Sequence, residues 1–183
     1  MPTYIAMLRG INVSGHKIVK MDRLRAAFES LGFHHVTTYV QSGNVVFTAA
    51  KDTPARLSGK IGEKMQRVFG FSVSTVLKTP KELEKVIENN PFAKNKQIDV
   101  SSLHVTFLSE PPATSARKKL EGIAAGPDQF RVARQEIYLH CPDGYGRTKL
   151  SNTAFEKMLS VSATTRNWKT INTLFEMASE IEA

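Results

Sequence analysis

The sequence contains a single cysteine, Cys141, among its 183 residues. One cysteine cannot form an internal disulfide, and no second cysteine or histidine stands at zinc-finger spacing from it. No run of eighteen apolar residues is present, which argues against a membrane-spanning helix. The segment before Arg9 also lacks the basic start of a secretory signal. These absences predict a cytoplasmic protein with no metal centre, no cofactor and no membrane partner.

Acidic residues are fewer than basic ones. The chain has 25 Lys and Arg against 17 Asp and Glu, a formal net charge of +8 and a pI near 9.7. No tail or block carries the excess. A basic surface of this kind is either simply well solvated or attracts phosphate-bearing partners, and composition alone leaves both interpretations open. With 41% hydrophobic residues, the chain can bury a sizeable core.

Hydrophobic periodicity and turn signals predict the elements of the first part of the chain. Short apolar or β-branched runs indicate strands, and apolar residues at three- and four-residue steps indicate helices. The predicted order is strand 4–8, helix 21–31, strands 36–40 and 44–48, helix 53–68 and strand 71–77. This is the split βαβ order of a ferredoxin-like sandwich.

The second part of the chain restarts the pattern. Thr79 and Pro80 open a helix that must end before Pro91. The elements predicted after it are strand 103–108, helix 116–122, strands 130–133 and 137–140, and helices 152–159 and 168–181. We therefore expect an α+β fold, in which a ferredoxin-like βαββαβ N-terminal half, residues 1–79, is packed on a second, smaller α+β half, residues 80–183, that ends in two helices.

Topology makes a further prediction for the first half. In a ferredoxin-like sandwich the first and second strands run parallel with the third between them. The end of the first strand and the turn between the second and third strands then lie at the same end of the sheet. We expect the loop 9–12 and the turn 41–44 to converge there, and both segments are polar and contain a glycine.

The loop 10–17 follows a strand and precedes a helix, where a phosphate-binding loop belongs. It misses the P-loop pattern, because His16 separates Gly15 from Lys17 and Ile18 stands where a magnesium-binding Ser or Thr is required. A looser backbone nest, aided by Lys17 or Arg9, is the alternative.

Three side chains near this loop could bind a ligand or serve the fold. Arg9 ends an apolar strand, where its guanidinium can bind a carboxylate or phosphate or, equally, a partner within the chain. Ser42 and Asn44 offer hydroxyl and amide groups beside Gly43. Residues of these types are also what a tight turn requires.

Two cationic segments stand out in the second half. The glycine-rich loop 142–149 ends in Arg147 and Lys149 and could hold an anion, although a solvated loop explains it as well. In the segment 163–169, Thr164 or Thr165 is expected to cap the last helix. Arg166 would then add positive charge where the helix dipole is already positive, which is better tolerated beside an anion or an acidic side chain.

No catalytic centre is indicated. The five histidines form no metal-binding motif, no nucleophile elbow of the Gly-x-Ser-x-Gly type is present, and the carboxylates are dispersed. Nothing in the sequence nominates a nucleophile or a general base.

The chain resembles a bacterial protein family classed as domain of unknown function 1697. The motifs that carry the resemblance are Leu-Arg-Gly-Ile-Asn-Val at 8–13, Tyr-Val-Gln-Ser-Gly-Asn-Val-Val-Phe at 39–47, and the segments 90–92, 137–139, 144–146 and 163–170. Ser14 and Thr148 depart from the usual pattern, which has Gly and Ser there. The resemblance implies an α+β fold with a ferredoxin-like part and brings no established activity or catalytic residues.

The leading hypothesis is a cytoplasmic protein that binds a small phosphate- or carboxylate-bearing ligand where the two halves meet. The expected ligand-binding residues are Arg9, Asn12, Gln41, Ser42, Asn44, Arg147, Lys149 and Arg166. One alternative is weak binding of nucleic acid through an exposed sheet and a basic surface, although the aromatic pairs of an RNA-recognition sheet are missing. Another is an enzyme that acts on a phosphorylated metabolite.

Overall fold

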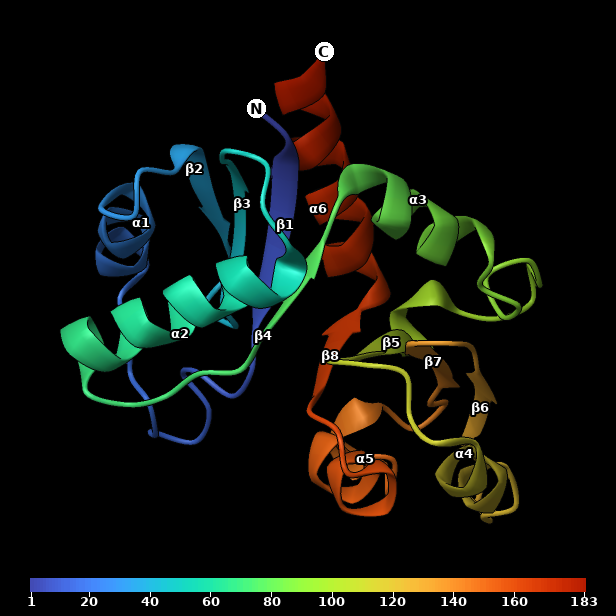
Figure 1. Cartoon of the computed structure of the whole chain (residues 1–183). Helices are drawn as coiled ribbons and strands as arrows, with labels where there is room; N and C mark the ends of the chain where they lie inside the picture. The colour runs from blue at the N-terminus through green and yellow to red at the C-terminus, as the bar shows by residue number, and fades with distance from the viewer. The chain divides into compact units, whose positions relative to one another are not determined.

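A computed structural model describes all residues from 1 to 183, and the chain divides into two compact units. The first unit comprises Met1–Lys85 and Thr173–Ala183, and the second comprises Val86–Asn172. Each unit contains a four-stranded antiparallel sheet together with helices (Figure 1). The predicted α+β class with two halves is therefore confirmed.

The first unit is built on the sheet β2-β3-β1-β4. Its elements are, in chain order, β1 (Thr3–Leu8), α1 (Met21–Glu29), β2 (His34–Tyr39), β3 (Asn44–Thr48), α2 (Pro54–Phe69) and β4 (Thr75–Lys78). The strand order is compatible with a ferredoxin-like arrangement, in which β1 and β2 are parallel and β3 lies between them. This arrangement places the end of β1 beside the β2–β3 turn.

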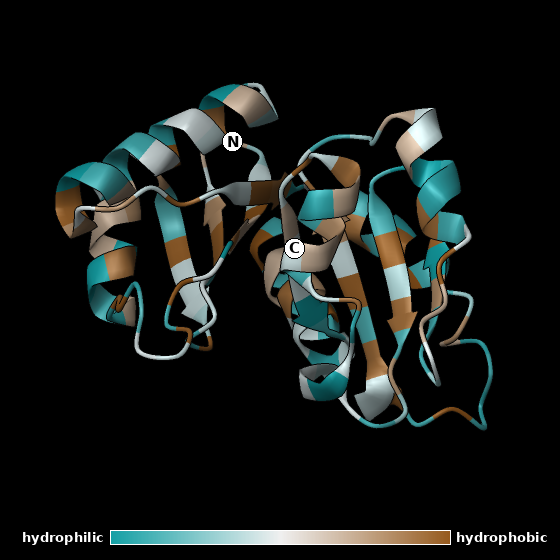
Figure 2. Ribbon diagram, turned by 90° about the horizontal axis from the view of Figure 1, so that it is seen from below, coloured by the Kyte–Doolittle hydropathy of each residue, from teal (hydrophilic) through white to brown (hydrophobic).

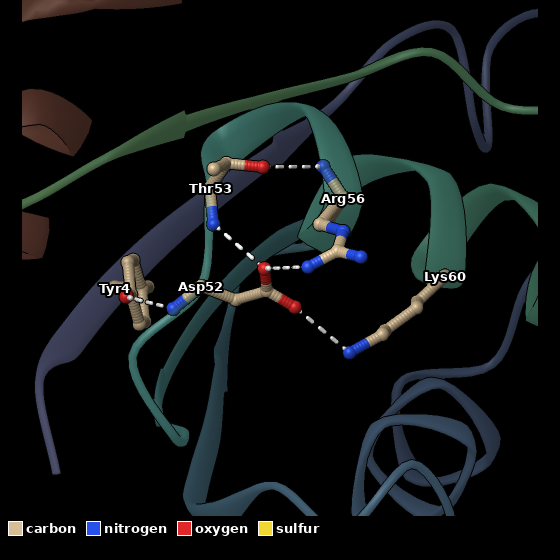
Figure 3. Close-up of polar contacts among 5 residues, drawn as sticks. All are labelled: Tyr4, Asp52, Thr53, Arg56 and Lys60. Atoms are coloured by element: carbon tan, nitrogen blue, oxygen red, sulfur yellow. Dashed lines mark hydrogen bonds and ion pairs between the residues drawn. The ribbon is translucent and has the colours of Figure 1, made fainter.

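Polar side chains fix where α2 begins. Thr53 Oγ1 accepts a hydrogen bond from the amide of Arg56, as an N-cap residue does. The carboxylate of Asp52 accepts hydrogen bonds from Lys60 Nζ at 2.9 Å and from the Thr53 amide at 2.8 Å (Figure 3). The bond from Lys60 lowers the pKa of Asp52 most, and the Thr53 amide adds to this effect. The Asp52 amide donates to the Tyr4 hydroxyl at 3.5 Å, which ties the helix start to β1.

The first unit buries both faces of its central strand. Tyr4 and Phe47 pack with the residues of α1 and α2, their ring centroids 5.7 Å apart. Ile5 and Met7 point to the other face and are fully buried too. Hydrophobic residues recur along the strands of both sheets in Figure 2, whereas the helices carry many hydrophilic ones. None of the helices is long and apolar enough to cross a lipid bilayer.

The second unit is built on the sheet β6-β7-β5-β8. The elements after β4 are α3 (Pro80–Glu88), η1 (Val100–Ser102), β5 (Leu103–Leu108), α4 (Thr114–Glu121), β6 (Gln129–Val132), β7 (Glu136–His140), η2 (Tyr145–Arg147), α5 (Asn152–Leu159), β8 (Ala163–Asn167) and α6 (Trp168–Glu182). Helix α3 begins in the first unit and ends in the second, and α6 begins in the second and ends in the first.

One strand was not predicted from the sequence. The segment expected to cap the last helix forms β8, which pairs with β5 so that Thr164 lies opposite Phe107. The helix cap is instead Asn167, whose Oδ1 accepts a hydrogen bond from the amide of Thr170 at 2.8 Å. The prediction that Thr164 or Thr165 caps α6 was wrong, because pairing with β5 satisfies the backbone of this segment.

The two units repeat the same hydrogen bonds at one end of their sheets. In the first unit the amides of Leu8 and Arg9 donate to the carbonyls of Gly43 and Ser74, both at 2.8 Å. In the second unit the equivalent donors are Leu108 and Ser109, and the acceptors are Gln135 and Ser162 at 2.8 and 2.9 Å. The units therefore share a backbone design that their side chains do not repeat.

Candidate functional site

Three segments of the first unit meet at the end of β1. The amide of Leu8 binds the carbonyl of Gly43 in the β2–β3 turn, and the amide of Arg9 binds the carbonyl of Ser74 before β4. The side-chain amide of Asn12 donates to the carbonyl of Gln41 at 2.8 Å. The predicted convergence of the 9–12 loop with the 41–44 turn is confirmed.

Asn12 holds this end of the unit together. Its Nδ2 donates to the carbonyls of Val19 at 2.9 Å and Gln41 at 2.8 Å, and its Oδ1 accepts from the amide of Val19 at 2.7 Å. Both ends of the carboxamide are thereby engaged within the chain. Asn12 was predicted as a ligand-binding residue, and the geometry gives it a positioning role in the loop.

The meeting segments contain cations but no carboxylate. We call residues 9–20, 40–43 and 72–74 the acid-free end of the first unit, since none of them is Asp or Glu. Their charged residues are Arg9, Lys17 and Lys20, and the next acidic residue along the chain is Asp22 in the first turn of α1. An anion at this end would meet attraction, and no carboxylate of these three segments would oppose it.

Lys17 is held in place within this cluster. Its ammonium group donates to the carbonyl of Ser72 at 3.1 Å and lies 5.7 Å from the centre of the Phe71 ring. The side chain is nevertheless exposed. Because an ammonium group has three donors, Lys17 can bind an anion while it keeps its contact with Ser72.

The backbone alternates in handedness from Gly10 to Ser14. Gly10, Asn12 and Ser14 have φ of 70°, 54° and 50°, while Ile11 and Val13 do not lie in the left-handed region, and the alternation ends at Gly15 with φ of 75°. Alternation of this kind produces backbone nests, in which successive N–H groups turn toward one concavity. The amides of Gly10, Ser14 and Gly15 donate to no carbonyl of the chain, so they remain available to an anion.

The predicted residues of the β2–β3 turn differ in exposure. Asn44 is fully buried, and its Nδ2 donates to the carbonyl of Tyr39 and to Ser42 Oγ, both at 3.0 Å. Gln41 and Ser42 are exposed. Asn44 therefore stabilises the turn, and the exposed Gln41 and Ser42 form part of the acid-free end.

Arg147 and Lys149 lie in the second unit, where they line one small hollow of about 170 Å³. Asp128 and Asp143 line the same hollow, and Asp128 also accepts a hydrogen bond from the Thr148 hydroxyl at 2.6 Å. Two carboxylates thus face the two cations. An anion in this hollow would meet repulsion as well as attraction, so the site is less suited to it than the acid-free end.

Arg166 lies on β8 opposite Val105, and it is buried. Its guanidinium donates to the carbonyl of Thr165 at 3.0 Å. Burial lowers the pKa of Arg166 to about 10, an effect that Tyr145 partly opposes. The group stays cationic at neutral pH. Its position on a strand differs from the expected place at a helix start.

Sequence reasoning missed that Arg166 has a counterpart in the first unit. Lys78 lies opposite Ile5 on β4, the last strand of its sheet, as Arg166 lies opposite Val105 on β8. Both cations are buried. The sequence does not show that Lys78 and Arg166 are equivalent, because their equivalence follows from the strand registers of the two sheets.

Sequence reasoning also missed Lys20, although a signal was present. The chain contains no Asp or Glu before Asp22, and none between Leu31 and Lys51. Once topology brings the 9–12 loop to the 41–44 turn, these two acid-free stretches become one surface. A count of carboxylates along the converging segments would have identified it.

The pKa shifts of Cys141 and His104 in the second unit do not favour a nucleophile. Burial raises the pKa of the Cys141 thiol to about 11, with Asp128 adding to the effect and the Thr148 hydroxyl opposing it. A thiol with this pKa is protonated and unreactive at neutral pH. Burial also lowers the pKa of His104, whose ring stacks on Tyr145 with centroids 4.9 Å apart.

The two inner strands of the first unit, β1 and β3, expose no side chain to a nucleic acid. All six residues of β1 are buried, and Tyr4 and Phe47 lie inside the core. Bases cannot stack on rings that are buried in this way.

Comparisons with known proteins support the fold and the family. A solved structure of a conserved bacterial protein from Streptococcus pneumoniae matches with a TM-score of 0.76 and 24% identity, covering 97% of this chain and 98% of that one. The comparison with curated proteins gives no match. The model of the family described as protein of unknown function (DUF1697) matches residues 1–138. The chain therefore belongs to this family, as its sequence motifs predicted.

Proposed function

We propose that the protein binds a small anionic ligand, bearing a phosphate or a carboxylate, at the acid-free end of the first unit. The observation that carries the proposal is the convergence of three segments that hold Arg9, Lys17 and Lys20 without a single carboxylate. The nest-like amides of Gly10 and Ser14 supply backbone donors in the same loop as these cations.

Binding fits this site better than catalysis on a phosphorylated metabolite. A proton transfer needs a group that can take up a proton near neutral pH. The acid-free end contains no carboxylate, and its one histidine, His16, is exposed with no carboxylate in these segments to orient it. The donors can hold an anion, but they provide no arrangement of base and nucleophile.

Calorimetric titration with inorganic phosphate, pyrophosphate and citrate at low ionic strength tests the proposal. We expect at least one anion to bind, and the double variant Lys17→Ala/Lys20→Ala to weaken its binding on the order of tenfold, because charge-assisted hydrogen bonds are lost. The matched control is Lys94→Ala/Lys96→Ala, which removes two exposed lysines from the second unit.

The control variant changes the net charge by the same amount as the test variant, so it separates a local site from general attraction by the +8 chain. Equal losses in the two variants would show that the anion responds only to net charge. Absence of binding by all three anions would remove the proposal.

A further inference from the structure

Aliphatic side chains are exposed at the same end of the first unit. Val13, Ile18 and Val40 are 55%, 62% and 46% exposed. They make up half of the six large hydrophobic residues that the whole chain exposes. Scattered exposed hydrophobic residues need no explanation, but a group of them on one surface indicates an interaction site.

The hydrogen bonds of Asn12 bring together the backbone positions next to these three residues. Val13 follows Asn12 in the chain, Ile18 precedes Val19, and Val40 precedes Gln41. The carboxamide of Asn12 binds the backbone of both Val19 and Gln41. Each aliphatic residue is therefore one position away from the same small cluster of hydrogen bonds. We call Val13, Ile18 and Val40 the aliphatic patch.

Val40 also carries backbone strain. Its φ of 50° lies in the left-handed region, which β-branched residues rarely adopt because Cβ crowds the backbone. A side chain that is about half exposed gains little from packing to offset that strain. Strained residues of this kind concentrate at functional sites, which singles out Val40 as a candidate interaction residue.

We propose that the acid-free end docks an acidic segment of a partner polypeptide, with apolar side chains that cover the aliphatic patch. The inference rests on the proposed function, since the same cations bind the partner's carboxylates. Charge complementarity selects this partner: the patch is bordered by Lys17 and Lys20. A second copy that docked through its own acid-free end would bring the same positive charge and be repelled.

The chemistry of the patch argues against nucleic acid. Single-stranded nucleic acids bind through aromatic rings on which bases stack. The exposed side chains of this patch are all aliphatic, and the ring of Phe71 at this end already contacts the ammonium of Lys17. Aliphatic groups instead match the Leu, Ile or Val side chains of a peptide.

The test compares two labelled peptides of equal length and charge by fluorescence anisotropy, one of Glu-Glu-Leu repeats and one of Glu-Glu-Ser repeats. We expect the leucine peptide to bind about tenfold more tightly, because only its side chains bury the patch. The double variant Val13→Ser/Ile18→Ser should abolish this difference. Val100→Ser is the matched control, since Val100 is 55% exposed like Val13 but lies in the second unit.

Each result decides the inference. Equal affinity for the two peptides, or a leucine preference that survives Val13→Ser/Ile18→Ser, would overturn peptide docking and leave anion binding intact. Binding of phosphate without binding of either peptide would have the same meaning. If neither phosphate nor the peptides bind, the proposed function is removed as well. Tighter binding of a single-stranded oligonucleotide than of the leucine peptide would overturn it in favour of nucleic acid. Unchanged melting temperatures confirm that the variants fold.

Discussion

At the scale of single residues, the carboxamide of Asn12 joins the loop after β1 to the β2–β3 turn through three hydrogen bonds. The left-handed backbone of Asn12 itself is tolerated because a short amide side chain can bind locally. The cations and the aliphatic patch are therefore presented by a loop with a defined shape. Single substitutions can therefore distinguish residues that hold the loop in its conformation from residues that bind a ligand.

Asn12→Ala should destabilise the protein by about 2–3 kcal/mol, since three hydrogen bonds of roughly 0.5–1.5 kcal/mol each are lost. Urea unfolding measures the change, and calorimetry should show weaker anion binding as well. Asn95→Ala is the control, because the exposed Asn95 accepts a single hydrogen bond, from the Gln97 amide. Equal stability losses in the two variants would contradict the role given to Asn12.

Val40→Asn should stabilise the protein by about 1 kcal/mol, because asparagine adopts the left-handed region more readily than a β-branched residue. The same variant should bind the leucine peptide less tightly. The stability is measured by urea unfolding and the binding by anisotropy. A fall in stability would show that Val40 contributes packing that outweighs its strain.

At the scale of elements, the β2–β3 turn and the loop after β1 fit closely. Gly43 has φ of 88°, and a Cβ built there would lie 2.5 Å from Ile11 Cδ1 and 3.1 Å from Leu8 Cβ. The turn can approach the loop this closely because Gly43 has no side chain. The shape of the acid-free end depends on that approach.

Gly43→Ala should therefore destabilise the protein by about 2 kcal/mol or more, through backbone strain and overpacking together. Gly144→Ala is a matched control, because Gly144 has φ of 89° and nothing within 4 Å of a built Cβ. The control isolates the strain, and the difference between the two variants in thermal unfolding reports the contact with Ile11. No difference would mean that Ile11 moves away at little cost.

The sequence predicted elements with strong local signals and missed those that depend on partners. Thr53 and Gly70 bound α2 as expected, since capping and a left-handed terminus are local properties. β8 was missed because Thr164 and Arg166 acquire strand geometry only by pairing with β5. Topology predicted that the 9–12 loop meets the 41–44 turn. It could not predict the exposure of Val13 or the hydrogen bonds that engage Asn12.

At the scale of the whole molecule, two units share a strand order and their sheet-end hydrogen bonds, but differ in the loops that follow. After β1 the loop is long and cationic, whereas the segment 109–113 after β5 contains Glu110 and two prolines. The net charge of +8 adds a general attraction for anions, which salt screens. We therefore propose anion binding at only one of the two similar sheet ends, the one in the first unit.

The stability of the whole fold should fall on mild acidification through His104. Burial lowers the pKa of His104 below its usual 6.5, and the backbone carbonyl of Ser102 opposes this only in part. Below about pH 6.5 the unfolded chain takes up a proton that the folded chain resists, so the free energy of unfolding decreases as the pH falls toward the folded pKa.

Urea unfolding of the wild type and of His104→Phe at about pH 7.5 and pH 5.5 checks this pH dependence. The variant keeps a ring that can stack on Tyr145 but cannot titrate. We expect the wild type to lose more stability than the variant between the two pH values. If the wild type and His104→Phe differ in stability by the same amount at both pH values, His104 is not the source of the pH dependence.

Nuclear magnetic resonance titration of ¹⁵N-labelled protein with pyrophosphate shows directly whether the acid-free end of the first unit binds anions. We expect saturable shifts of the Gly10, Ser14 and Gly15 amides, with the Gly126 and Gly144 amides of the second-unit hollow unchanged. Shifts centred on Gly126 and Gly144, or no saturable shift at the three loop amides, would contradict the proposed site.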